Sequence, residues 1–240
     1  MYGSQAKIGF MLPSSCTVFE QEFLKVTLGL EGVIGCPTRL LLNETDATGL
    51  TSMNEGIDLA AEQLATIDLD VIVYMCTSGS FMDGQDGNQS IKDRLSRITG
   101  CLNVTTTSES VVEAMSTLGI KRSTMLTPYN EDISSREVDF LASQGVHIID
   151  YKFRDVEDNL DRGSLLPEES FHYASQLNFK EADGTFLSCA NVRAIEIIDS
   201  LEAHTNKPVV TSAQATIWKA LRMSGVDSPI SGYGTLLLDH

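Results

Sequence analysis

Two cysteines stand where a thiol can take part in chemistry. Cys76 follows an apolar run at residues 70–75, Cys189 follows one at 184–188, and each precedes a stretch that can start a helix. The positive end of a helix dipole and its unpaired N–H groups favour a thiolate. A thiolate can act as a nucleophile or as a base, and a second thiol facing it can donate a proton to the other face of the same carbon. We therefore predict that Cys76 and Cys189 form a catalytic pair.

Small polar residues near the ends of the apolar runs can bind a carboxylate. Thr77 and Ser78 follow Cys76 directly and form a turn rich in hydroxyl and backbone N–H donors. Ser14 and Tyr129 close two further runs and can supply donors to the same place. The glycine-rich segment 84–87 lacks the spacing of a phosphate loop or a dinucleotide fingerprint, and we interpret it as a turn.

Composition restricts the partners and the compartment. The chain has 33 Asp and Glu against 17 Lys and Arg, a net charge of −16, and no cationic cluster that could neutralise nucleic-acid phosphates. No apolar run approaches the ~20 residues that cross a bilayer, and the first residues lack the features of a secretory signal. Five widely spaced cysteines without a CxxC or CxxH pair indicate neither a disulfide framework nor a zinc site. We therefore expect a cytoplasmic protein with no nucleic-acid partner, no membrane partner and no metal.

Apolar runs alternate with amphipathic stretches along the whole chain. This order is typical of βαβ units, in which helices cover both faces of a parallel sheet. The predicted strands lie at residues 7–12, 32–42, 70–75, 123–126, 146–151, 184–188 and 208–211. The predicted helices lie at residues 56–66, 108–118, 134–144, 192–204 and 213–224.

The two halves of the chain repeat the same landmarks in the same order. The separations are nearly constant: 115 residues for Pro13 and Pro128, 113 for Cys76 and Cys189, and 106 for Gly119 and Gly225. We predict two pseudo-symmetric, flavodoxin-like α/β lobes, each a parallel sheet flanked by helices. Residues 1–107 plus 214–240 form the N-terminal lobe, against which residues 225–240 are expected to pack, and residues 108–213 form the C-terminal lobe. Because ligands of open α/β sheets bind at the carboxyl ends of the strands, the active site is expected in the cleft between the lobes.

Six short segments of the chain match a known pattern in order. The sequence resembles the aspartate/glutamate racemase superfamily, most closely its maleate cis–trans isomerase and arylmalonate decarboxylase branch. The resemblance covers nearly the whole chain, and the matching segments lie at residues 13–20, 74–81, 127–129, 158–159, 187–193 and 208–215.

This resemblance implies an enzyme that needs neither a cofactor nor a metal. In the maleate isomerases of the family, the first cysteine adds to an alkene carbon and the second transfers a proton. By resemblance Cys76 is then the nucleophile and Cys189 its partner. Tyr129 and Asn159 hold the substrate carboxylates, helped by the turns at Thr77–Ser78 and Ala190–Asn191.

Two positions depart from the family pattern. Cys16 stands where the maleate isomerases carry an asparagine that contacts the substrate, and Ala213 replaces a second asparagine. The loss of the first amide favours a bulkier or less charged acid than maleate. Arylmalonate decarboxylases carry glycine at the position of Cys76, so the presence of both cysteines favours isomerisation or racemisation over decarboxylation.

Several functions stay open at this point. The favoured one is a maleate-isomerase-like cis–trans isomerisation of a small carboxylic acid. The alternatives are a two-base racemase of Asp/Glu or hydantoin type, an arylmalonate-type decarboxylase, and a non-catalytic protein that binds a small acid. The expected partner is a small carboxylate substrate, and a homo-oligomer is left open.

Overall fold

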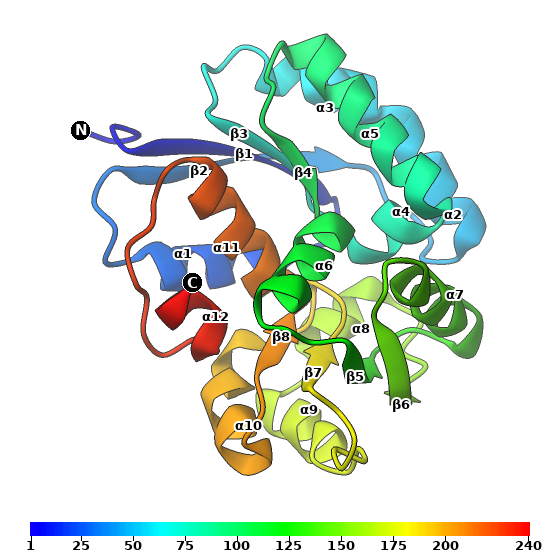
Figure 1. Ribbon diagram of the computed structural model, residues 1–240. Coiled ribbons are helices and arrows are strands. Elements are labelled where there is room, and N and C mark those ends of the chain that lie inside the picture. The colour runs from blue at the N-terminus through cyan, green and yellow to red at the C-terminus, as the bar shows by residue number, and fades with distance from the viewer.

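The chain folds into two four-stranded parallel sheets of the same topology (Figure 1). The computed structural model describes residues 1–240. One sheet has the strand order β2-β1-β3-β4, and the other has the order β6-β5-β7-β8. The strands are β1 (Ala6–Pro13), β2 (Val33–Leu40), β3 (Val71–Tyr74), β4 (Val104–Thr106), β5 (Arg122–Thr127), β6 (His147–Phe153), β7 (Gly184–Leu187) and β8 (Val209–Thr211).

Helices connect the strands and flank the sheets. In Figure 1, α3 and α5 lie on one side of the first sheet, with α1 and α11 on the other. The helices are α1 (Phe19–Thr27), α2 (Ala47–Met53), α3 (Ile57–Leu64), α4 (Thr77–Phe81), α5 (Gly84–Thr99), α6 (Thr107–Thr117), α7 (Glu131–Ser143), α8 (Asn159–Ser164), α9 (Pro167–Ala174), α10 (Ile198–Thr205), α11 (Ser212–Met223) and α12 (Gly234–Asp239), with two short 3₁₀ helices, η1 (Asn54–Gly56) and η2 (Ile195–Ile197).

This architecture confirms the predicted α/β fold. Every residue of β3 and of β7 is buried, as expected for inner strands of a parallel sheet that is covered on both faces. Seven of the eight strands lie where the apolar runs predict them. The exception is β4, which is only three residues long and carries two threonines, so it leaves no apolar run in the sequence.

The two halves meet at a pair of helices that begin directly at strand ends. Thr106 ends β4 and caps α6 by accepting the N–H of Glu109 at 3.2 Å. Thr211 ends β8 and caps α11 by accepting the N–H of Gln214 at 3.0 Å. These are ordinary N-cap bonds, and they leave no connecting residue between strand and helix. Helices α6 and α11 then pack against each other at the centre of the molecule (Figure 1).

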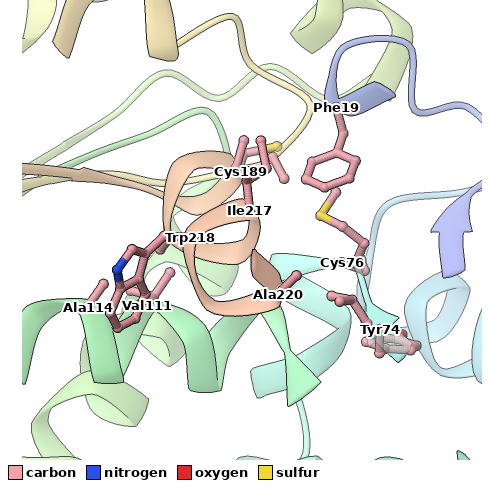
Figure 2. Close-up of a cluster of buried hydrophobic side chains, with 14 of the residues drawn as sticks. Phe19, Tyr74, Cys76, Val111, Ala114, Cys189, Ile217, Trp218 and Ala220 are labelled. Carbon is pink, nitrogen blue, oxygen red and sulfur yellow. The ribbon is translucent and has the colours of Figure 1, made fainter. Parts of the chain in front are cut away.

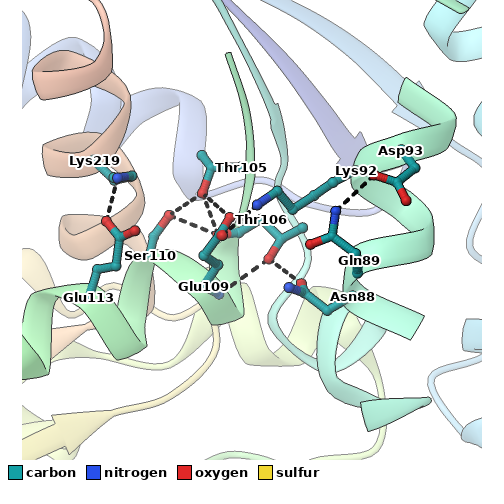
Figure 3. A network of polar contacts seen from close by, with 10 residues as sticks. All are labelled: Asn88, Gln89, Lys92, Asp93, Thr105, Thr106, Glu109, Ser110, Glu113 and Lys219. Carbon is teal, nitrogen blue, oxygen red and sulfur yellow. Dashed lines mark hydrogen bonds and ion pairs between the residues drawn. The ribbon is translucent and has the colours of Figure 1, made fainter. Parts of the chain in front are cut away.

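Hydrogen bonds and an ion pair stabilise the contact between α6 and α11 and their neighbours (Figure 3). The Thr106 hydroxyl donates to Asn88 Oδ1 of α5 at 2.5 Å, so the start of α6 is tied to α5 as well as to β4. Glu113 of α6 forms an ion pair with Lys219 of α11. The contact between the halves is therefore both apolar and charged.

The structure contains helices that the sequence analysis did not predict. The segment 84–87 is not a turn but the first turn of α5, which runs for 16 residues. Helix α12 contacts α10, α11 and β8, and the expectation that residues 225–240 pack on the first lobe stays a prediction. The lobe boundaries at residues 107/108 and 213/214 stay a prediction. None of the helices combines the length and the apolar character that crossing a bilayer requires.

Candidate active site

The carboxyl ends of four inner strands bring the predicted site residues together. Segments that follow β1, β3, β5 and β7 surround a cavity of about 30 Å³ between the halves. Nine of the ten residues predicted for the site line it: Cys16, Cys76, Thr77, Ser78, Tyr129, Asn159, Cys189, Ala190 and Asn191. Figure 2 shows Cys76 and Cys189 approaching the same buried region from different segments. Their roles in catalysis and binding stay predictions.

Ser14 is the predicted residue that does not line the cavity. Its hydroxyl oxygen accepts the N–H of Leu42 at 3.0 Å, and its own N–H donates to Leu40 O at 2.6 Å. Ser14 thus fixes the segment after β2 instead of facing a ligand. A hydroxyl after a strand suits either role, so the sequence pattern could not separate them.

Cys76 occupies the N-cap of the five-residue helix α4. Its sulfur accepts the N–H of Gly79, with an N···S distance of 3.4 Å. Burial raises the pKa of the Cys76 thiol to about 12, although the Gly79 N–H and the Ser78 hydroxyl act in the opposite direction. The predicted stabilisation of a thiolate by the helix end is therefore outweighed by desolvation in this ligand-free site.

Gly79 is required by the packing around that sulfur. A Cβ atom at position 79 would lie 2.5 Å from the Tyr74 hydroxyl and 3.1 Å from Cys76 Sγ. Only glycine allows the first turn of α4 to come this close to the thiol.

Cys189 has a different backbone conformation. Its φ is +80°, in the left-handed region that residues with a side chain rarely adopt. Such strain costs of order 1–3 kcal/mol and gathers at functional sites. Burial raises the pKa of the Cys189 thiol, while the Arg162 charge, the Tyr129 hydroxyl and the Asn191 N–H oppose the rise. Cys189 therefore has a cation nearby that Cys76 lacks.

A third thiol completes the wall of the cavity. Cys16 is 3% exposed, and burial raises its pKa to about 11, with backbone N–H groups of Phe19 and Val18 acting against the rise. It presents a neutral sulfur where the family pattern has an amide.

Two asparagines hold the halves together around the site. Asn191 Oδ1 accepts the N–H groups of Thr17 at 2.8 Å and Val18 at 3.2 Å, and its Nδ2 donates to Asn159 O at 2.6 Å. Asn159 Nδ2 in turn donates to Ser15 Oγ at 2.9 Å. The polar atoms of the Asn191 side chain are therefore engaged by the protein and tie the segment after Cys189 to the start of α1.

The sequence analysis missed Arg162, the only charged residue that lines the cavity. Arg162 is 4% exposed, donates to Val156 O at 2.8 Å and to Glu157 O and Thr45 Oγ1 at 3.2 Å, and lies 5.0 Å from the centre of the Tyr129 ring. No carboxylate pairs with it. A buried cation without a counterion is costly, so this position suits an anionic ligand. The sequence did contain one signal for Arg162, because this residue lies about one helical turn after Asn159, which was predicted to bind substrate.

An outer cavity of about 550 Å³ adjoins the inner one. The two share Leu42, Thr45, Asn159 and Arg162, which form the wall between them. The inner cavity has room for water alone, so we expect these residues to move when a larger ligand reaches the thiols. No group of three His, Cys, Asp or Glu side chains is placed to hold a metal ion.

Comparison with known proteins identifies the class of the chain. Residues 36–237 match the family model described as Amdase, arylmalonate decarboxylase, and the chain belongs to this family. It is 23% identical to the maleate isomerase of Geobacillus stearothermophilus over 96% of both chains, and 28% identical to the arylmalonate decarboxylase of Bordetella bronchiseptica over 81% of this chain and 82% of that one.

Solved structures share the fold over almost the full length. A cysteine-to-serine mutant of the Nocardia farcinica maleate cis–trans isomerase, with a covalently bound succinylcysteine intermediate, superposes with a TM-score of 0.92 at 23% identity, covering 98% of this chain and 99% of that one. The resemblance and the two-sheet fold predicted from the sequence are confirmed.

Proposed function

We propose that this chain is a cofactor-independent cis–trans isomerase of a small dicarboxylic acid, with maleate as the expected substrate. The observation that carries the proposal is a cavity lined by Cys76 of one half, by Cys189 of the other half and by a buried arginine without a carboxylate partner. The relatives named maleate isomerase, and the neighbour with a succinylcysteine intermediate, support the same reaction.

The proposed reaction uses the two thiols in different roles. Cys76 loses its thiol proton to solvent and adds as a thiolate to one alkene carbon, and the π electron pair moves to the neighbouring carbon and its carboxylate. Cys189 donates its proton to that carbon, which leaves a succinyl group bonded to Cys76 and free to rotate about a C–C single bond. After rotation Cys189 takes the proton back, the C–S bond breaks, and fumarate leaves with Cys76 again a thiolate.

Charge complementarity has to be local in this protein. The chain carries a net charge of −16, which repels a dianion at long range. Arg162 supplies a fixed positive charge inside the cavity, and Tyr129 beside it supplies a hydroxyl. In a site shielded from water these groups stabilise the enediolate that forms when Cys76 adds.

Decarboxylation of a substituted malonate is the second candidate, because the matching family model is described by that activity. The two reactions differ in their need for Cys76. A decarboxylase releases CO₂ and keeps its activity when Cys76 is replaced by glycine, whereas the isomerase loses it.

An NMR experiment in D₂O tests the proposal. Maleate, substituted maleates, aspartate, hydantoins and arylmalonates are each incubated with the protein and with Cys76→Ala and Cys189→Ala. We expect fumarate from maleate with the wild type and none with either variant. Deuterium entering the α-carbon of an amino acid or hydantoin without alkene isomerisation would instead indicate a racemase. Ligand-induced stabilisation that survives both substitutions, with no turnover of any acid, would indicate a binding protein.

The cytoplasm is the proposed compartment. All five cysteines are unpaired, which suits a reducing environment. Self-association of the chain stays a prediction, to be checked by light scattering.

A further inference from the structure

A buried glutamate behind the cavity contacts the segment that carries Cys189. Glu137 of α7 is 2% exposed, and its Oε1 accepts the hydroxyl of Ser188, the residue before Cys189, at 2.6 Å. Its other oxygen, Oε2, is buried without a hydrogen-bond partner in the protein. A buried polar atom of this kind costs free energy unless something satisfies it.

A second unpartnered oxygen belongs to the segment that carries Cys76. Thr77, the residue after Cys76, is 4% exposed, and its Oγ1 is also buried without a partner. Thr77 and Glu137 line the same cavity of about 10 Å³, whose remaining walls include Phe81, Ser108 and Phe140. This volume is about the smallest that can hold one ordered water molecule.

The repeat places a matching carboxyl in the other half. Glu22 of α1 precedes Glu137 by 115 residues, the separation of Pro13 and Pro128. It is equally buried, and its Oε1 accepts the N–H groups of Ala194 and Ile195, which follow Cys189 in the opposite half. In each half the helix after the first strand thus carries a buried carboxyl close to the other half's cysteine segment. Glu22 bonds to residues that follow Cys189, and Glu137 shares a cavity with Thr77, the residue after Cys76.

We propose that Glu137 is a positioning residue that joins the two thiol-bearing segments, through Ser188 on one side and through one ordered water shared with Thr77 on the other. The role in turnover rests on the proposed function, whereas the link itself does not. Burial raises the pKa of Glu137 to about 8, against a smaller opposing effect of the Ser188 hydroxyl. At neutral pH the side chain is therefore mainly a neutral acid, whose O–H donates to the water while Oε1 accepts from Ser188.

The link has a direct consequence for the two sulfurs. Ser188 directly precedes Cys189 in the sequence, and Thr77 directly follows Cys76. A connection between Ser188 and Thr77 therefore fixes the two thiols relative to each other across the halves. Proton delivery next to the attacked carbon depends on that spacing, and a displacement near 1 Å can cost about 100-fold in rate.

Alkylation of the thiols tests the link without any substrate. The rates at which iodoacetamide modifies Cys76 and Cys189 are measured by peptide mass spectrometry for the wild type, Glu137→Leu, Glu137→Gln, Thr77→Val and the Glu137→Leu/Thr77→Val double variant. We expect Glu137→Leu and Thr77→Val each to change the rates at both cysteines by at least about threefold, with the double variant no worse than Glu137→Leu, because both remove the same connection. Glu137→Gln keeps an acceptor for Ser188 and a donor for the water, so it should stay within about twofold of the wild type.

Packing alone is controlled by Phe140→Leu, which enlarges the same cavity but removes no polar atom. This variant should lose thermal stability and keep both alkylation rates. Two results together would overturn the water bridge. In one, Glu137→Leu changes the alkylation rate of Cys189 but not that of Cys76. In the other, the effects of Glu137→Leu and Thr77→Val add up in the double variant. Failure of Glu137→Gln to restore the wild-type rates would overturn the water bridge as well.

Kinetics and crystallography complete the test. With maleate, Glu137→Leu should lower kcat about 10- to 100-fold and leave KM within about twofold, since the groups that touch the substrate remain. A high-resolution crystal structure should show a water within hydrogen-bond distance of Thr77 Oγ1 and Glu137 Oε2, and its absence would refute the link. If no acid is turned over, the proposed function fails, while the alkylation and crystallographic results still decide the link.

Discussion

The two cysteine segments occupy equivalent places in the repeat and yet are built differently. Cys76 has an extended backbone, with φ −148°, and caps a short helix. Cys189 has φ +80° and is followed by a turn, with the next helical residues only at Ile195. Burial raises the pKa of both thiols, and the Arg162 charge opposes this rise at Cys189, whereas backbone and hydroxyl hydrogen bonds oppose it at Cys76.

This difference indicates how a duplicated scaffold can support asymmetric chemistry. Both copies place a thiol at the carboxyl end of an inner strand, which is a property of the fold. The conformational strain and the cation are found in only one copy, and they belong to the segments after the strands. The two halves thus supply a common position, and the differences between their loops suit the proposed division into a nucleophile and a proton donor.

Replacing the thiols should give the largest effects. Cys76→Ser and Cys189→Ser should each lower kcat with maleate by at least about 1,000-fold, since each removes a group that takes part in bond making. Only Cys189→Ser should accumulate a covalent adduct in intact-mass spectra, because the C–S bond is made by Cys76. An adduct on Cys189 in Cys76→Ser would reverse the assignment, and Cys36→Ser should behave as the wild type.

Removing the cation should have the next largest effect. Arg162→Met should lower kcat/KM for maleate about 100-fold, the loss expected for a charged hydrogen bond to a carboxylate. The matched control is Arg154→Met, because Arg154 stacks on Tyr173 at 4.2 Å and does not line the inner cavity. Equal losses in both variants would remove the argument for a local counterion.

The pH dependence of alkylation compares the thiols directly. Because burial raises the pKa of Cys76 to about 12 and also raises that of Cys189, both are neutral at pH 7. Reaction with iodoacetamide needs the thiolate, so the rate at Cys76 should rise about tenfold per pH unit from pH 7 to 10 without a plateau. A plateau below pH 9 would show that the pKa of Cys76 lies below 9 and that burial does not dominate it.

Backbone strain is tested by thermal unfolding of alanine and glycine variants. At position 189, glycine should be more stable than alanine by about 1 kcal/mol, because only glycine adopts a positive φ without cost. At position 76 the order should be reversed by about 0.5–1 kcal/mol, because glycine there only adds flexibility to the unfolded chain. The same order at both positions would mean that Cys189 is not strained.

Giving the first half an amide donor should have the smallest effect. Cys16→Asn replaces a neutral thiol in the cavity wall with a hydrogen-bond donor, worth about 0.5–1.5 kcal/mol, and should lower KM for maleate about 2- to 10-fold with kcat little changed. An increase in KM would indicate that the pocket of this chain is shaped for a bulkier acid.

The sequence predicted the features that depend on apolar runs and on repetition. Strands such as β3 and β7 are continuous apolar segments, so their ends and the cysteines that follow could be located. Helix α5 was missed because glycine occupies its first position and most of its surface is polar, which resembles a turn.

Features that depend on tertiary contacts could not be predicted in the same way. Arg162 lies among acidic residues in the sequence, and only the fold shows that it turns inward to Tyr129. The positive φ of Cys189 leaves no trace in the residue type, since the position is usually suited to glycine. The raised pKa of Cys76 follows from burial, which overrides the effect of a five-residue helix.

The direct passage from β4 into α6 and from β8 into α11 limits how the molecule can deform. With Thr106 and Thr211 serving as both strand end and helix cap, neither junction contains a spare residue that could act as a hinge. The Glu113–Lys219 pair further clamps this side. We therefore expect a small acid to enter by displacement of the opposite rim, around Thr45 and Arg162, while the junctions at Thr106 and Thr211 keep their geometry.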